Sequence, residues 1–231
     1  AEVPKMFEQG ISSFKMYMTY PAMMIGDKDL FYALEEIKRF GGIAGVHCEN
    51  AGVIDALIAA HKAAGQTAPS SHPECRPNPL EAEAVAHLLR ITEVAGVPIV
   101  IVHLSTKEAL LEVMRARARG QQVYVETCPH YLLLDDACLQ EDGRVKMNPP
   151  LRDKSDREAL LEGLADGTID MIATDHAPHS AEEKGRGLEK SAMGIVGLET
   201  AFPLLYTELV KPGVISIERL MELLHDAPCR R

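Results

Sequence analysis

Four side chains of the sequence have the chemistry of metal ligands and lie far apart along the chain: Lys15, His47, His103 and Asp175. Each belongs to a short apolar stretch that predicts a β-strand, and three of them stand where the stretch ends. The intervals of 32, 56 and 72 residues between them exclude a local zinc-finger site. Such intervals are typical of ligands that come from separate strands.

Neutral imidazole and carboxylate groups bind zinc and similar divalent ions. Two such ions about 3.5–4 Å apart can activate a shared hydroxide near neutral pH. Taken singly, each histidine is more often a hydrogen-bonded polar residue than a ligand, and an aspartate before a helix is usually an N-cap. The four together favour a metal centre. Lys15 is a further reason to expect a metal centre, because burying a lysine in a strand costs several kcal/mol unless it is paired or neutralised.

The chain alternates between predicted strands and predicted helices. The strands are expected at Ser12–Tyr17, Gly42–His47, Pro98–His103, Gln122–Glu126 and Asp170–Thr174. The helices are expected at Lys28–Phe40, Ala51–Ala64, Pro79–Ala95, Lys107–Arg119, Lys154–Ala165, Leu198–Val210 and Ile217–Leu224. Gly41, Gly96 and Gly120 follow three of these helices, where C-terminal glycines are expected.

Apolar runs without alternation, such as "GIAGV" and "VPIVIV", predict a parallel sheet that is covered on both faces. Five βα units then allow either a doubly wound sheet or part of a (β/α)8 barrel. The chain has neither GxGxxG after a strand nor GxxxxGK[ST], so nucleotide-binding folds lose support. The barrel gains support because its catalytic groups project from the C-terminal ends of strands.

Composition limits the binding partners and the cellular location that we expect for the chain. The net charge of −10 argues against nucleic acid as the main partner, and no apolar run is long enough to predict a membrane span. Five irregularly spaced cysteines fit a reducing, cytoplasmic location. The chain begins without Met, on what looks like the end of a helix, so we expect an internal piece of a longer protein.

Several motifs resemble those of the amidohydrolase superfamily, and above all those of its cyclic amidohydrolases: hydantoinase, dihydropyrimidinase, dihydroorotase and allantoinase. The motifs are "SFKMYMTY", "GVHCEN", "IVHLSTKEAL", "VYVETCPHYLLLDD", "MNPPLRDKSDREALLEGLADGTID", "ATDHAPH" and "MGIVGLETAFPLLYTELV". The resemblance implies a (β/α)8 barrel with two divalent ions, expected to be zinc, at its mouth. It also implies a small-molecule cyclic amide as substrate.

The resemblance assigns roles to individual residues. Lys15 matches a lysine that carbon dioxide converts to a carbamate, which bridges the two metals. His47 and His103 match later ligands, and Asp175 matches a ligand that also serves as general base and acid. Tyr20 matches a tyrosine whose hydroxyl stabilises the oxyanion.

Two parts of the family pattern are absent. The His-x-His of the first barrel strand does not occur, and neither do the first three strands or the small β-sandwich. We therefore expect residues 1–231 to form a partial barrel domain, about strands four to eight, that alone cannot hold the whole binuclear centre.

The motifs leave the substrate open. "SFKMYMTY", "GVHCEN" and "PLLYTE" favour hydantoin or dihydropyrimidine rings, whereas "MNPPLR" and "TDHAPH" favour dihydroorotase, in which Asn148 and His179 would lie near the substrate carboxylate. Asn148 could instead be a turn residue before a proline, and His179 an exposed loop residue. Allantoinase and a non-catalytic dihydropyrimidinase-like binding protein are further alternatives, although all the matching ligands are present. The resemblance also implies a homo-oligomer, either a dimer or a tetramer.

Overall fold

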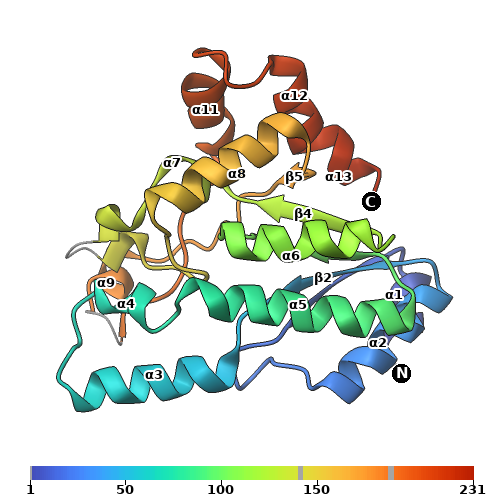
Figure 1. Ribbon diagram of the computed structural model, residues 1–231, viewed down its shortest axis with the longest axis horizontal. Coiled ribbons are helices and arrows are strands. Elements are labelled where there is room, and N and C mark those ends of the chain that lie inside the picture. The colour runs from blue at the N-terminus through green and yellow to red at the C-terminus, as the bar shows by residue number, and fades with distance from the viewer. Residues whose placement is uncertain (1, 140–142, 187–189) are drawn as a thin grey trace.

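A computed structural model of the chain describes residues 2–139, 143–186 and 190–231 (Figure 1). Its sheet has five strands in the described residues: β1 (Ser13–Tyr17), β2 (Ile43–His47), β3 (Ile99–Ile101), β4 (Val123–Thr127) and β5 (Met171–Ile172). All four neighbouring pairs are parallel, and the spatial order follows the chain order from β1 to β5. A doubly wound sheet reverses its strand order at a switch point. The order seen here never reverses, as in a (β/α)8 barrel.

The register of the strands separates two faces of the sheet. Lys15 is level with Gly45, Gly45 with Val100, and Val100 with Tyr124. Because side chains alternate along a strand, every second residue from these positions faces the same side. His47 lies two residues beyond Gly45 on β2 and is level with Tyr17. It therefore shares a face with Lys15.

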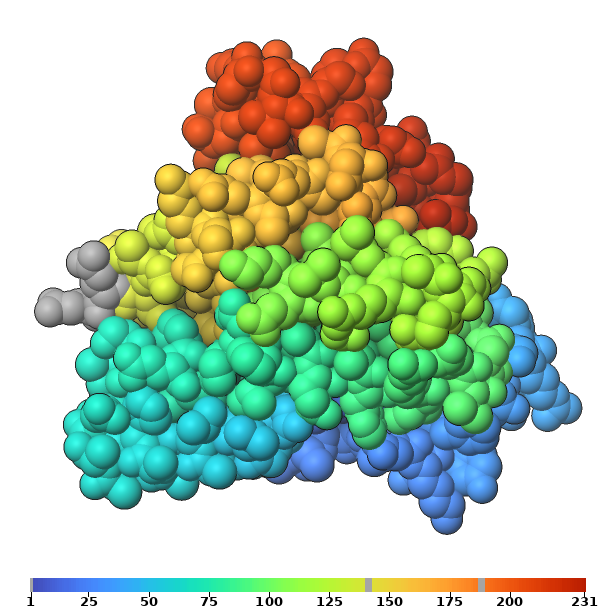
Figure 2. Space-filling view, viewed as in Figure 1, coloured from blue at the N-terminus to red at the C-terminus, as the bar shows by residue number. Residues whose placement is uncertain are grey.

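The opposite face of the sheet carries the hydrophobic core. Val46, Ile101 and Val125 are fully buried there against helices. Figure 1 shows α5 and α6 side by side in front of the strands with α8 beyond them, and Figure 2 shows their side chains closing over this face. The apolar strands are thus covered as their composition predicts.

The main helices are α2 (Asp27–Arg39), α3 (Ala51–Ala63), α5 (Asn78–Ala95), α6 (Lys107–Ala118) and α8 (Lys154–Asp166). Asn50, Thr106 and Asp153 cap three of them by accepting hydrogen bonds from free backbone N–H groups. The glycines expected after helices adopt positive φ, for example 61° at Gly96.

The remaining elements are short. They are α1 (Val3–Glu8), α4 (Ser71–Glu74), α7 (Pro129–Leu133), η1 (Asp136–Leu139), η2 (Gly143–Val145), α9 (Ala181–Lys184), α11 (Ala201–Leu205), η3 (Tyr206–Val210), α12 (Ile217–Met221), η4 (Glu222–Asp226) and α13 (Ala227–Cys229). No helix within the described residues is both long enough and apolar enough to cross a membrane.

Two strands are shorter in the structure than the sequence predicts. The strand predicted at Pro98–His103 is Ile99–Ile101, and the strand predicted at Asp170–Thr174 is Met171–Ile172. The residues beyond each strand turn away to form the pocket described below. Leu198–Val210 also differs, because its helix begins only at Ala201 and becomes a π-helix from Tyr206.

Candidate active site

The C-terminal ends of the strands open into a shared pocket. Six of the seven residues expected at a functional site line it: Lys15, Tyr20, His47, His103, Asn148 and Asp175. These residues come from β1, β2 and the segments after β1, β3, β5 and η2, so only the folded chain brings them together. Met147, Met193 and Gly194 complete much of the wall.

Three pocket residues have left-handed backbone conformations. Tyr20, His103 and Asp175 have φ angles of 69°, 39° and 45°, and no other non-glycine residue of the described segments has positive φ. This conformation is costly for residues with a Cβ atom, and it clusters where the fold must aim a side chain. Each residue follows a strand end and directs its side chain back into the pocket.

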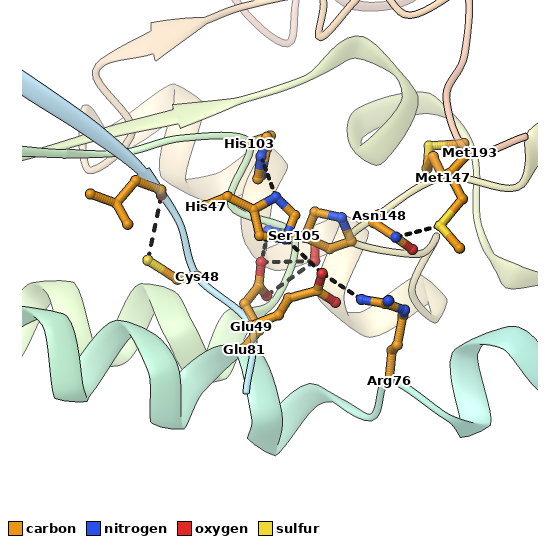
Figure 3. Close-up of polar contacts among 12 residues, drawn as sticks. His47, Cys48, Glu49, Arg76, Glu81, His103, Ser105, Met147, Asn148 and Met193 are labelled. Atoms are coloured by element: carbon orange, nitrogen blue, oxygen red, sulfur yellow. Dashed lines mark hydrogen bonds and ion pairs between the residues drawn. The ribbon is translucent and has the colours of Figure 1, made fainter. Parts of the chain in front are cut away.

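His47 and His103 form a buried pair (Figure 3). Their side chains are 2% and 3% exposed, and His47 Nδ1 lies 3.0 Å from His103 Nε2. The other ring nitrogen of His47, Nε2, lies 2.7 Å from Glu49 Oε2. Arg76 donates a hydrogen bond of 2.7 Å to the same carboxylate oxygen.

Burial and neighbouring charges shift the pKa values of these buried side chains. Burial would raise the pKa of Glu49, but Arg76 and His47 outweigh that effect and lower its pKa to about 2. Burial lowers the pKa of His103 well below its usual value, and the neighbouring His47 and Lys15 act in the same direction. His103 is therefore a neutral imidazole near pH 7, the form in which histidine binds metals.

Lys15 is exposed to the pocket, so the expectation that it is buried is wrong. It lies on β1, the first strand of the described sheet, and on the face opposite the main hydrophobic core. Desolvation by the pocket wall still lowers its pKa, while Asp175 and Glu126 oppose the shift. Asp175, which follows the other edge strand, is also exposed.

Tyr20 is half-buried, and its ring lies 5.1 Å from that of His47. Burial and the nearby Glu49 raise its pKa, so its hydroxyl stays protonated and able to donate. Asn148 is buried, its Nδ2 contacts Met193 Sδ, and its Oδ1 has no hydrogen-bond partner among the described residues.

His179 is the predicted site residue that the structure leaves out of the pocket wall. It is exposed, and its Nε2 lies 3.1 Å from the carbonyl oxygen of Met193. Because Met193 and Gly194 line the pocket, His179 stands behind that wall.

The residues present fit divalent metal at the histidine pair. Two imidazole nitrogens that face each other at 3.0 Å are placed as two ligands of one zinc ion would be, each about 2.0–2.1 Å from the metal. The other nitrogen of His103, Nδ1, is buried without a hydrogen-bond partner among the described residues. No cluster of three or more histidine, cysteine, aspartate or glutamate ligands occurs within the described residues. The three expected ligands of these types, His47, His103 and Asp175, therefore do not form one such cluster in the structure.

Sequence reasoning missed Glu49 and Arg76. Glu49 stands two residues after His47 in "GVHCEN", which could have marked it, since the side chain of a ligand histidine often donates to a carboxylate. Arg76 gave no signal, because it lies 27 residues further along and in no pattern.

Comparison with known proteins places the chain in a family. Residues 1–223 match the Amidohydrolase family. A D-phenylhydantoinase of Escherichia coli O1:K1 is 39% identical over 236 residues, covering 99% of this chain and 51% of that protein. A dihydroorotase of Halalkalibacterium halodurans is 52% identical over 153 residues, covering 66% of this chain and 36% of that protein.

Solved structures agree with this placement. A D-hydantoinase structure superposes with a TM-score of 0.94 at 33% identity, covering 99% of this chain and 52% of that one. The L-hydantoinase of Arthrobacter aurescens gives a TM-score of 0.92 at 30% identity, covering 100% and 53%. The chain belongs to the amidohydrolase family and has the fold of part of a hydantoinase barrel. It spans about half the length of the hydantoinases it matches.

Proposed function

We propose that the protein containing this chain hydrolyses a ring C–N bond of a cyclic amide, with hydantoin or dihydropyrimidine rings as the leading substrates. The observation that carries the proposal is the convergence of Lys15, His47, His103, Asp175 and Tyr20 on one pocket at the C-terminal ends of parallel strands. These side chains are 160 positions apart at their extremes, since 175 − 15 = 160, and have no common structural task that would require this grouping.

In this proposal Lys15, as its carbamate, would hold two divalent ions together with His47, His103 and Asp175. Zinc is the expected metal. The ions would lower the pKa of an attacking water and polarise the ring carbonyl. Lowering the pKa of Lys15 favours the neutral amine, the form that reacts with carbon dioxide.

The chain's own groups have distinct tasks in the reaction. Tyr20 Oη donates a hydrogen bond to the carbonyl oxygen as negative charge develops there. The Asp175 carboxylate takes the proton of the attacking water and gives it to the departing ring nitrogen. No covalent bond between enzyme and substrate is needed.

Dihydroorotate hydrolysis is the second candidate, and specific observations favour it. Asn148 lies in the pocket wall, and a dihydroorotase is among the relatives, with 52% identity over 153 residues. Against it, the hydantoinases match almost the whole chain. His179 weakens as a direct carboxylate ligand, because its side chain lies behind the wall.

The test is a parallel assay of hydantoin, dihydrouracil, dihydroorotate and allantoin with the full-length protein. Turnover of hydantoin or dihydrouracil above the other two supports the leading proposal. Dihydroorotate turnover that falls in Asn148→Ser and changes little in His179→Ala supports the second candidate. Turnover of none of the four, in protein that binds metal, would contradict both.

The wider features of the protein follow the same proposal. A complete barrel with a β-sandwich, a cytoplasmic location and assembly into dimers or tetramers remain predictions. Sedimentation of the full-length protein as a monomer at micromolar concentration would contradict the last of these.

A further inference from the structure

A chain of buried polar contacts extends from His47 away from the pocket (Figure 3). Glu49 Oε2 accepts from His47 and from Arg76, at 2.7 Å each. The backbone oxygen of Arg76 accepts in turn from Arg152, and Arg152 Nε donates to Ser105 Oγ at 3.0 Å. Glu49 and Arg76 are 1% and 4% exposed.

The contacts decide which nitrogen of His47 carries the proton. An arginine guanidinium stays charged in proteins, and its partner at 2.7 Å is an acceptor. The Glu49 oxygen that Arg76 holds therefore accepts from His47 Nε2, which must be the protonated nitrogen. Nδ1 is left with its lone pair directed at His103 Nε2.

We propose that Glu49, held by Arg76, is a positioning residue that fixes His47 with Nε2 protonated and Nδ1 free to bind metal. The use of Nδ1 as a metal ligand rests on the proposed function, whereas the fixed protonation of Nε2 does not. Partners of this kind typically change metal affinity by 10–100-fold when they are removed.

The first measurement needs no variant. Histidine-labelled, metal-free protein is studied by ¹⁵N NMR, which distinguishes the two neutral tautomers of each imidazole. The proposal expects His47 to carry its proton on Nε2 at pH 7.5. A wild-type protein in which His47 Nδ1 carries the proton would overturn it.

Variants then test the cause. In Glu49→Gln the amide can donate to Nε2 as well as accept from it, so His47 is expected to populate both tautomers, and the dissociation constant for Zn²⁺, measured by chelator competition, rises about 10–100-fold. Arg76→Gln is expected to act in the same direction. Unchanged tautomers and Zn²⁺ affinity in folded Glu49→Gln protein would overturn the proposal.

Glu81→Gln is the matched control. Glu81 is almost as buried as Glu49, and it accepts from the backbone N–H and the hydroxyl of Ser105. It lies at the far end of the same chain of contacts, 4.0 Å from Arg152, and makes no hydrogen bond with His47. The substitution is expected to lower the midpoint of thermal unfolding and to leave the His47 tautomer unchanged. An equal tautomer shift in Glu81→Gln would show general loosening of the core and overturn a specific role for Glu49. A wild-type protein that keeps the Nε2 proton but binds no Zn²⁺ would contradict the metal centre of the proposed function and still support the hold of Glu49 on His47.

Discussion

The two sides of the pocket are built in different ways. On the β2–β3 side, His47 and His103 are almost fully buried, and a second layer of side chains behind His47 is itself paired. On the β1 and β5 side, Lys15 and Asp175 are exposed and belong to the edges of the described sheet. On the first side, side-chain contacts hold His47 in place, whereas on the second side Lys15 and Asp175 face the open pocket.

The largest expected effect tests the exposed side. Lys15→Ala removes the proposed carbamate and should lower the catalytic rate of the full-length protein by about 10³-fold or more, because the proposed metal centre that activates water would be lost. In metal-free protein the substitution should leave the unfolding midpoint almost unchanged, because Lys15 is exposed to the pocket. Short carboxylic acids added to the assay should restore part of the activity. Full activity without them would show that Lys15 has no part in the centre.

The next effect compares two tyrosines of the same wall. Tyr20→Phe should lower kcat by about 10²–10³-fold with little change in KM, because the lost hydroxyl acts on charge that develops during the reaction. Tyr17 also lines the pocket, and Tyr17→Phe serves as the control, with kcat expected within threefold of wild type. Equal losses in the two variants would remove the special role of Tyr20.

A smaller effect concerns pH and a buried histidine, His72 of α4, which contacts the backbone of the pocket residue Met147. Burial lowers the pKa of His72 to about 4, and its Nε2 lies 2.9 Å from the carbonyl oxygen of Met147. The unfolded chain binds a proton near pH 6.5 that the folded chain refuses until about pH 4, so the free energy of unfolding should fall as the pH drops through this window. The loss from this group is about 2–3 kcal/mol.

His72→Gln removes the titration and keeps a hydrogen-bond donor. Between pH 6.5 and 4, its free energy of unfolding in urea should change by about 2–3 kcal/mol less than that of wild type. A His72→Gln slope equal to that of wild type would contradict the prediction.

The smallest effect lies in the loop after Asp175. Ser180 and Glu183 form a capping box at the start of α9. Ser180→Ala should destabilise α9 by about 1 kcal/mol. Amide hydrogen exchange in residues 181–185 should become about fivefold faster, with no change in α5. Exchange that speeds up equally in α5 would show that the two sides do not unfold separately.

Much of the fold was predictable because the signals were local. Apolar runs located the five strands, and a glycine marked the end of several helices. The strand ends also identified the pocket residues, since parallel strands bring their C-terminal ends to one edge.

Other features depend on the three-dimensional path and left no local signal. The exposure of Lys15 goes with its place on the sheet face opposite the main hydrophobic core. His179 follows Asp175 by four residues, yet the return of the chain at Met193 puts it behind the pocket wall. Arg76 meets Glu49 only because the segment before α5 crosses the end of β2.

The left-handed backbone at Tyr20, His103 and Asp175 has a consequence for mutational tolerance. Glycine accepts this conformation freely, and for other residues it costs about 1–2 kcal/mol. Selection for stability alone would therefore favour glycine at the positions where selection for chemistry requires a functional side chain. A library sorted first for folding and then for turnover should enrich glycine in the first sort and lose it in the second, and asparagine at position 175 should survive the first sort better than alanine.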